Sequence, residues 1–318
     1  MPSATQTINE LNAPAFSFEL LPPIKGNSIQ KVFNTIDLLK EFNPIHINIT
    51  AHRDEVTYAK NEQELYERRI VRKRPGTVAV AISIQNKYGI KVIPHIICCG
   101  FTKHETEYAL IDLNFLEMND VLLLRGDNSK AERFVQTTEE SNKYAIDLIH
   151  QVNDFNKGIL LDNTIIEPFD NHFSFGVAGY PEKHEEAPNL QTDIEFLKEK
   201  VANGAGYIVT QMFFDNAHYY NFVDKCRKEG ITVPIIPGIK PITILPQLTD
   251  LPKIFHIDLP EALVIELRKC KTNEDVTAVG IEWATAQAKD LLSNGIHLLH
   301  FYTYMAVKSV RKIAEQIY

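Results

Sequence analysis

Short runs of apolar and β-branched residues alternate along this chain with longer stretches whose apolar residues recur every three or four positions. Continuous apolar runs of this length are typical of parallel strands that are covered on both faces. We predict a strand at each of eight runs: Ala15-Leu20, Pro44-Thr50, Lys91-Cys98, Asp120-Leu124, Phe173-Ala178, Tyr207-Phe213, Val233-Pro237 and His297-Tyr302.

Between these runs the spacing of apolar residues changes to that of an amphipathic helix. Ser28-Phe42 is one example, and Thr102-Met118 opens with a capping pair formed by Thr102 and Glu105. Further helices are predicted over Thr192-Asn203, Asn216-Lys228, Asn273-Leu292 and Val307-Gln316.

Strand-then-helix units, repeated eight times, predict an α/β fold of the (β/α)8 TIM-barrel class. The alternative is an open Rossmann-like sheet, but none of the 14 glycines forms the G-x-G-x-x-G turn that cradles a dinucleotide there. An acidic insertion over Gly158-His172 and a proline-rich segment over Pro241-Pro260 interrupt the regular spacing. Neither marks a second domain, so we predict a single domain over residues 1–318.

Composition narrows the possible partners. The chain is 44% hydrophobic and carries a formal net charge of -8 with acids and bases interspersed, so it has no basic footprint for nucleic acid. Met1-Asn12 is polar and no apolar run is long enough to span a membrane, which indicates neither a signal peptide nor a membrane protein. The four cysteines form no C-x-x-C pair, so we expect reduced thiols, no metal site and a cytoplasmic location.

Candidate catalytic groups lie where the predicted strands end, because (β/α)8 enzymes place their chemistry at that end of the barrel. Glu19 stands between Phe18 and Leu20, in surroundings where an unpaired carboxylate is costly to bury. Either it pairs with a nearby Lys or Arg, or its pKa is raised and it acts as a general acid.

The other strand ends are less specific. His95, alone in an apolar run, is more often a core histidine than a catalyst, and Asp127 can simply cap a turn. Gln211 is more telling, since a buried amide must find partners and at a strand end it often finds them on a ligand.

Six segments, taken together, resemble the signature segments of the methylenetetrahydrofolate reductase family in its bacterial, barrel-only type. They are Phe18-Pro23, Leu124-Asp127, Ala178-Ala187, Thr210-Asp215, Ile236-Ile239 and His300-Thr303. The resemblance covers most of the chain, from about Phe16 to Thr303.

This resemblance implies a flavin-dependent oxidoreductase that holds FAD noncovalently in the barrel without a Rossmann turn. NADH or NADPH reduces the flavin and leaves, and 5,10-methylenetetrahydrofolate takes its place and is reduced to 5-methyltetrahydrofolate, a methyl source for methionine synthesis. The reaction is of the ping-pong type, and relatives form homo-oligomers. The sequence shows no motif that decides between NADH and NADPH.

The resemblance also implies roles for individual residues. Glu19 matches the acid that protonates the leaving nitrogen of the folate, and Asp127 matches the carboxylate beside pterin and flavin. Lys200 is expected near the diphosphate and Asp193 near the adenosine hydroxyls. The substrate residues would be Glu19, Asp127, Gln211, Gln247 and Tyr302. The FAD residues would be Thr50, His95, Arg125, Gly126, Asp127, Tyr144, Ala145, Tyr180, His184, Asp193 and Lys200.

One departure from the family pattern leaves alternatives open. The Arg that usually contacts the substrate after the last strand is replaced by Ala306, and Lys308 or Arg311 is a hypothetical substitute. A proline-dehydrogenase-like FAD barrel is disfavoured because no Arg pair for a substrate carboxylate follows the last strand. A noncatalytic flavin- or folate-binding subunit is disfavoured because Glu19, Asp127 and Gln211 are kept.

Overall fold

The computed structural model describes residues 2–126, 140–304 and 306–318. Eight strands close a barrel in the order β1-β10-β9-β8-β7-β6-β5-β2. The predicted (β/α)8 class is therefore confirmed. Asp127, predicted to contact both pterin and flavin, lies outside the described residues.

The barrel strands fall where the apolar runs predicted them. They are β1 (Ala15–Leu20), β2 (His46–Ile49), β5 (Val92–Ile97), β6 (Asp120–Leu124), β7 (Ser174–Gly179), β8 (Tyr207–Met212), β9 (Ile235–Ile239) and β10 (Leu298–Tyr302). β1 and β6 match their predictions at both ends. β9 is displaced by two residues toward the C-terminus, so Val233 and Pro234 precede the strand.

All six predicted helices form. They are α2 (Gln30–Leu39), α4 (Lys103–Phe115), α6 (Leu190–Ala202), α7 (Asn216–Lys228), α10 (Asn273–Ser293) and α11 (Val307–Ile317). The capping pair at α4 is confirmed: Thr102 Oγ1 accepts from the backbone N–H of Glu105 at 3.1 Å, and Glu105 Oε2 accepts from that of Thr102 at 2.8 Å. Five α-helices were not predicted: α1 (Ala4–Asn9), α3 (Thr77–Tyr88), α5 (Ala145–Asn156), α8 (Gln247–Phe255) and α9 (Glu261–Lys269).

The chain comprises two compact units. The first consists of Met1–Leu20, Phe33–Asn48 and Ser174–Tyr318, and the second of Leu21–Val32 and Ile49–Phe173. The first unit therefore holds α1, β1, β7 to β10 and the helices from α6 onward, whereas the second holds β5, β6 and α3 to α5.

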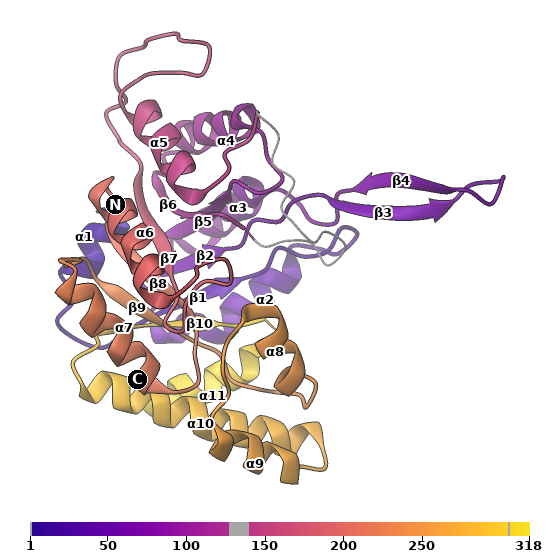
Figure 1. Ribbon diagram of the computed structural model, residues 1–318, viewed down its shortest axis with the longest axis vertical. Coiled ribbons are helices and arrows are strands. Elements are labelled where there is room, and N and C mark those ends of the chain that lie inside the picture. The colour runs from indigo at the N-terminus through magenta and orange to yellow at the C-terminus, as the bar shows by residue number, and fades with distance from the viewer. Residues whose placement is uncertain (1, 127–139, 305) are drawn as a thin grey trace. The chain divides into compact units, whose positions relative to one another are not determined.

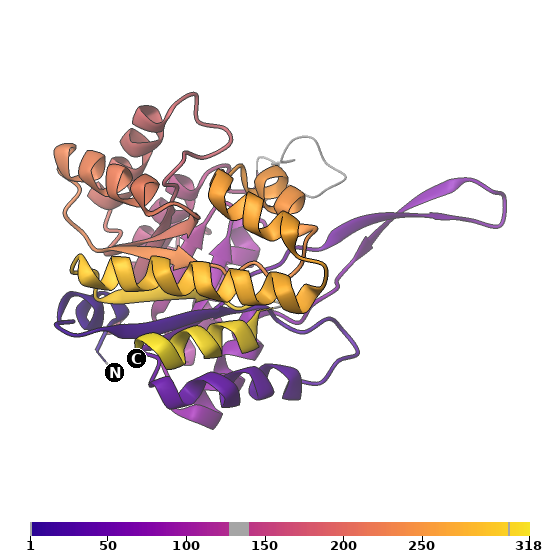
Figure 2. The same cartoon turned by 90° about the horizontal axis from the view of Figure 1, so that it is seen from below.

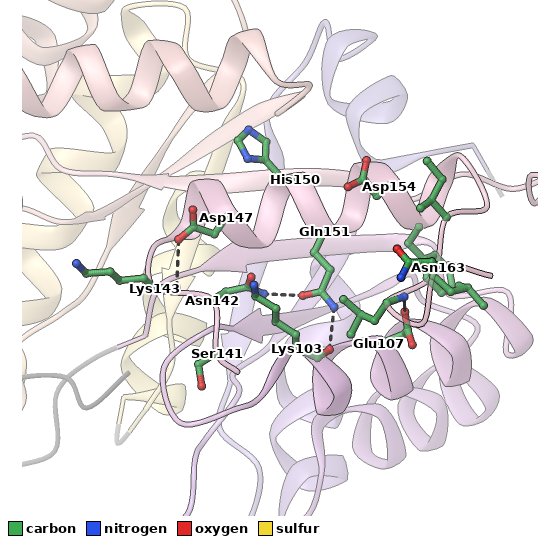
Figure 3. Close-up of a pocket in the computed structure, with 14 residues that line it drawn as sticks. Lys103, Glu107, Ser141, Asn142, Lys143, Asp147, His150, Gln151, Asp154 and Asn163 are labelled. Carbon is green, nitrogen blue, oxygen red and sulfur yellow. Dashed lines mark hydrogen bonds between the residues drawn. The ribbon is translucent and has the colours of Figure 1, made fainter. Parts of the chain in front are cut away.

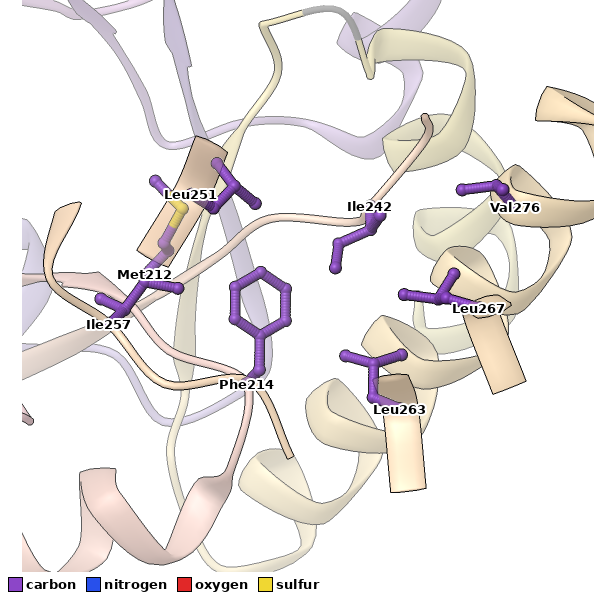
Figure 4. Close-up of a cluster of buried hydrophobic side chains, with 8 residues drawn as sticks. All are labelled: Met212, Phe214, Ile242, Leu251, Ile257, Leu263, Leu267 and Val276. Carbon is purple, nitrogen blue, oxygen red and sulfur yellow. The ribbon is translucent and has the colours of Figure 1, made fainter. Parts of the chain in front are cut away.

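The first unit has an apolar cluster that holds α8, α9 and α10 against the ends of β8 and β9. Phe214 lies at its centre in Figure 4, and Trp283 of α10 donates its indole N–H to the carbonyl oxygen of Phe214 at 2.9 Å. α10 runs beside α11 (Figure 2). The buried members of the cluster are Met212, Phe214, Ile242, Leu251, Ile257, Leu263, Leu267 and Val276.

The second unit carries an antiparallel hairpin that the sequence analysis did not predict. Its strands are β3 (Glu55–Lys60) and β4 (Tyr66–Val71), and the hairpin extends away from the helices of this unit (Figure 1). Tyr58 and Tyr66 are 61% and 70% exposed. Because neither face of this ribbon is covered, its sequence lacks the apolar alternation on which strand prediction depends.

No helix of the described residues is both long and apolar enough to cross a bilayer. The described residues also contain no group of three or more His, Cys, Asp or Glu side chains arranged to hold a metal ion. The four cysteines are free thiols. Burial raises the pKa of Cys98 and of Cys226 to about 12, so both stay protonated and unreactive at neutral pH.

Candidate active site

Three ionisable side chains of the first unit stand in one row across three adjacent strands. β10 lies between β1 and β9, and its register pairs Glu19 with Tyr302. Phe301 pairs with Ile239, so Lys240, the next residue after β9, is level with Tyr302. Residues in register on neighbouring strands point to the same face of the sheet, so a carboxyl group, a phenol and an ammonium group share this end of the three strands.

Lys240 is the member of the row that the sequence analysis did not name. Its side chain is buried, with 5% exposure, and its Nζ donates to the carbonyl oxygen of Tyr304 at 3.0 Å. Burial lowers the pKa of Lys240 to about 8, although the negative charge of Glu19 acts in the opposite direction. The available signal was a lysine that directly precedes Pro241, three residues after the predicted strand Val233-Pro237.

Tyr302 is held as a neutral hydrogen-bond donor. Its hydroxyl donates to the carbonyl oxygen of Thr210 at 2.7 Å, and burial, with the charge of Glu19, raises the pKa of this phenol well above its usual value. The next residue, Thr303, donates its hydroxyl to the backbone oxygen of Glu19. The phenol is therefore anchored to the backbone of β8, and the backbone of Glu19 is held by the side chain of Thr303.

Gly238 is required where the Tyr302 ring crosses β9. A Cβ at position 238 would lie 2.5 Å from Cε2 of Tyr302 and 2.4 Å from the carbonyl oxygen of Thr210. The ring can reach Thr210 only because no side chain stands there.

Replacing Gly238 with Ala is therefore expected to move the Tyr302 ring out of the row. We expect a loss of about 3 kcal/mol in the free energy of unfolding, the upper range for inserting a methyl group into a packed core. Urea denaturation of both proteins measures it. Gly230→Ala is a control for a glycine-to-alanine change without a packing clash, because nothing lies within 4 Å of a Cβ there. It is not a neutral substitution, since Gly230 has a φ of +84°. A Gly238→Ala protein as stable as the wild type would contradict the tight packing.

The two glutamines predicted to bind substrate have different surroundings. Gln211, at the end of β8, is half-buried, and its Oε1 accepts from the backbone N–H of Met212 at 2.9 Å. Gln247, the first residue of α8, is buried, and its Oε1 accepts from the backbone N–H groups of Thr243 at 2.7 Å and Ile244 at 3.2 Å. Gln247 thus shapes the loop after β9, a structural role that the sequence did not indicate.

Three of the residues predicted to contact FAD lie together in the first unit. The rings of Tyr180 and His184 meet edge to face, with centroids 4.7 Å apart. Asp193, buried in the first turn of α6, accepts the backbone N–H of His184 at 2.8 Å. Burial raises the pKa of Asp193, whereas this hydrogen bond and the charge of Lys200 lower it. Lys200 is the fourth predicted FAD residue of this unit, and its charge acts on Asp193.

The loop that carries Tyr180 and His184 is fastened at two glutamates. Glu182 lies 2.7 Å from Nδ1 of His218 on α7 and accepts the backbone N–H of Asp258 at 2.7 Å. Glu185 lies 2.8 Å from Nε2 of His256, the residue that ends α8. Between them Lys183 has a φ of 98°, a conformation that non-glycine residues rarely adopt and that concentrates at functional sites.

The remaining predicted FAD residues lie in the second unit. Thr50 follows β2 and its hydroxyl lies 3.0 Å from Nε2 of His52, and His95 is buried within β5. The Arg125 guanidinium lies 5.8 Å from the centroid of the Tyr144 ring, within the range of a cation–π contact. Tyr144 is the N-cap residue of α5, and Ala145 is its first residue.

Gly126 is required by its backbone and by its neighbours at the end of β6. Its φ of +88° is accessible to glycine at little cost, and an added Cβ would lie 3.2 Å from the Cβ atoms of both Ile97 and Cys99. Next to it along the chain, Arg125 offers a cation close to the aromatic ring of Tyr144. A cation and an aromatic ring are groups that a phosphate-bearing or aromatic cofactor can use.

A pocket of about 570 Å³ in the second unit is separate from these residues. It lies among α4, α5 and the segment over 159–163, and none of the residues predicted for catalysis or cofactor binding lines it (Figure 3). Its polar groups satisfy one another: Asn142 donates to Gln151 at 2.6 Å, and Gln151 donates to the carbonyl oxygen of Lys103 at 2.8 Å. We assign no ligand to it.

Comparison with known proteins shows to which family this chain belongs. The family model described as methylenetetrahydrofolate reductase matches residues 4–318, nearly the whole chain. The chain belongs to the methylenetetrahydrofolate reductase family. The match extends across both units, so the resemblance found in six short segments holds for the complete barrel.

Individual members of the methylenetetrahydrofolate reductase family are distant in sequence. "Methylenetetrahydrofolate reductase (NADH) 1" of Arabidopsis thaliana is 31% identical over 315 residues, which cover 96% of this chain and 48% of that protein. "Probable methylenetetrahydrofolate reductase (NADPH)" of Caenorhabditis elegans is 28% identical, with 95% and 42% covered. The chain thus spans about half the length of these relatives. The "5,10-methylenetetrahydrofolate reductase" of Salmonella typhimurium is 30% identical, with 90% and 85% covered.

Solved structures show the same fold at low identity. An uncharacterized protein from Clostridium thermocellum, described as binding two copies of 5-methyl-5,6,7,8-tetrahydrofolic acid, matches with a TM-score of 0.59 at 13% identity, covering 98% of each chain. A 2,3-dimethylmalate lyase matches with a TM-score of 0.50 at 8% identity, covering 98% of this chain and 82% of the lyase. These likenesses support the barrel alone.

Ala306 stands where the family usually has an Arg that contacts the substrate. The structure shows where its two hypothetical substitutes, Lys308 and Arg311, lie. Arg311 lies 2.6 Å from Glu41 and 2.9 Å from Glu315, so its guanidinium is engaged in surface ion pairs. Lys308 is exposed on α11. The cation level with Glu19 and Tyr302 is instead Lys240, from the neighbouring strand.

Proposed function

We propose that this chain reduces 5,10-methylenetetrahydrofolate to 5-methyltetrahydrofolate as a single FAD-binding barrel domain, with NADH or NADPH as the co-substrate. The observation that carries the proposal is the row of Glu19, Tyr302 and Lys240 at the ends of three adjacent strands, in a chain whose family membership extends over residues 4–318. A carboxyl group beside an immobilised neutral phenol suits acid catalysis on a nitrogen heterocycle.

Protonation of the folate has to precede hydride transfer to it. The five-membered ring of the folate must open to an iminium, and the nitrogen that leaves must be protonated as its bond to the methylene carbon breaks. We assign this proton transfer to Glu19, whose backbone is anchored by Thr303. Gln211 and Tyr302 are assigned to orienting the pterin, with Gln247 shaping the loop after β9.

FAD, when bound, supplies the hydride that reduces the iminium. From the family resemblance we propose as its contacts Tyr180, His184, Asp193, Lys200, Thr50, His95, Arg125, Gly126, Tyr144 and Ala145. What supports the proposal is the cation of Lys200 near Asp193 and the cation of Arg125 near the Tyr144 ring. The role of Asp127 beside pterin and flavin stays a prediction from the family resemblance.

An anaerobic half-reaction experiment tests the proposal. Purified protein is expected to be yellow, to bleach on addition of NADH or NADPH, and to recover its colour when methylenetetrahydrofolate is added. The absorbance of oxidised flavin follows each step separately. Flavin that stays reduced after addition of the folate would refute the activity, and bleaching by proline instead would identify the rival proline-dehydrogenase chemistry.

A further inference from the structure

We propose that Lys240 stores the proton that Glu19 delivers to the substrate, so that Lys240 acts on the substrate only through Glu19. This inference rests on the proposed function and goes beyond it, because it assigns the source of the proton to a residue on a different strand. It is carried by the strand registers, which place a buried ammonium group level with the carboxyl group, on the two strands that flank β10.

Strand order and register set the two groups at the same level of the sheet, within range of each other's charge. β9 and β1 are separated in the sheet only by β10, and the registers place Lys240 and Glu19 on either side of Tyr302. Lys240 is 5% exposed, and its charge interacts with that of Glu19. A buried ammonium group is costly, so a sequence that keeps one needs a compensating contact or a function.

The charge of Lys240 interacts with one acidic side chain of the described residues. Among the described residues, the charged group that acts on Lys240 is Glu19 on β1. Tyr302 on β10 is a neutral phenol already committed to Thr210. The carbonyl oxygen of Tyr304 accepts one Nζ hydrogen, which fixes the position of the ammonium group and leaves its other two N–H bonds for other acceptors.

The proton balance follows from this pair. The proposed transfer starts from a proton held on Lys240 Nζ. When the folate occupies the site, an Nζ–H proton passes to the Glu19 carboxylate, and the Glu19 proton passes to the leaving nitrogen as its bond to the methylene carbon breaks. Lys240 is left as a neutral amine and regains a proton from water after the product leaves. No oxidant or further reactant is required.

The test is the pH dependence of flavin reoxidation by methylenetetrahydrofolate, measured anaerobically after stoichiometric reduction. In the wild type we expect the rate to fall above about pH 8, where Lys240 loses its proton. In Lys240→Met the rate at neutral pH should fall about 100-fold, the typical contribution of a proton-transfer group. Any remaining decline should move to lower pH, since Glu19 then acts alone. Flavin content and flavin reduction by NADH or NADPH should be unchanged.

Two further variants separate proton storage from charge or packing. Lys240→Arg keeps the positive charge but cannot release a proton, so it should also be slow and show no decline near pH 8. Lys253→Met removes an exposed lysine of α8 and should behave as the wild type.

The outcomes are distinct. Wild-type rates in Lys240→Arg, or an unchanged pH profile in Lys240→Met, would overturn the inference while leaving the reductase intact. An equal loss in both half-reactions would show a merely structural role and overturn it as well. Wild-type flavin that the folate does not reoxidise would overturn the proposed function, and this inference with it.

Discussion

Replacing Glu19 with Gln is expected to lower the rate of methylenetetrahydrofolate reduction by about 10² to 10⁴-fold, the range typical of losing a general acid. The amide has nearly the same shape as the carboxyl group and keeps its place between the buried side chains of Phe18 and Leu20. It has no acidic proton to give to the leaving nitrogen. The backbone anchor from Thr303 does not depend on the side chain and should persist.

Flavin reduction separates this effect from a general loss of structure. Bleaching of the Glu19→Gln protein by NADH or NADPH should be close to that of the wild type, because no proton transfer to a folate nitrogen occurs in that half-reaction. Glu195→Gln, an exposed glutamate on α6, is the matched control and should leave both half-reactions unchanged. Folate turnover at the wild-type rate in Glu19→Gln would show that another group is the acid.

Replacing Lys240 with Met is expected to stabilise the protein at neutral pH by about 3 kcal/mol. A fall in pKa from 10.5 to about 8 on folding corresponds to roughly that cost for keeping the buried ammonium group protonated. Methionine fills a similar volume and has no charge to desolvate. Loss of the hydrogen bond to Tyr304 and of the partner of Glu19 will reduce the gain.

The direction of the pH effect is also determined. Between about pH 8 and pH 10.5 the unfolded chain holds a proton on Lys240 that the folded chain has released, so the stability of the wild type rises with pH through this window. The difference between the two proteins should therefore shrink as the pH approaches 10.5 and disappear above it. Urea denaturation at several pH values measures this.

Lys253→Met serves again as the control and should change stability by less than about 0.5 kcal/mol, as exposed substitutions usually do. A Lys240→Met protein less stable than the wild type at pH 7 would mean that attractive contacts outweigh the burial cost. Together with slower folate reduction, the expected stabilisation would identify Lys240 as a residue kept for function at the expense of stability.

The sequence by itself determined the barrel. Runs such as Ala15-Leu20 and Asp120-Leu124 are mostly apolar, as strands covered on both faces usually are, and the bounds of both were predicted without error. The capping pair at Thr102 and the strand-end position of Glu19 could also be predicted from the sequence, since each depends on residues a few positions apart along the chain.

Elements without such a local signal were missed. The hairpin β3–β4 has no covered face, and so no alternation of apolar and polar residues to reveal it. The short helix α8 lies in a proline-rich segment and contains Pro252, which is a poor helix former, and Leu251 of α8 packs in one cluster with Phe214.

The candidate site was likewise predicted only in part from the sequence. Residue types and motifs pointed to Glu19, Gln211 and Tyr302, but Lys240 follows its strand as an ordinary polar residue, more than two hundred positions from Glu19. Only the closure of the sheet, which puts β10 between β9 and β1, places its ammonium group level with that carboxyl group. Pairing between distant strands is a property of the folded sheet, and no local pattern records it.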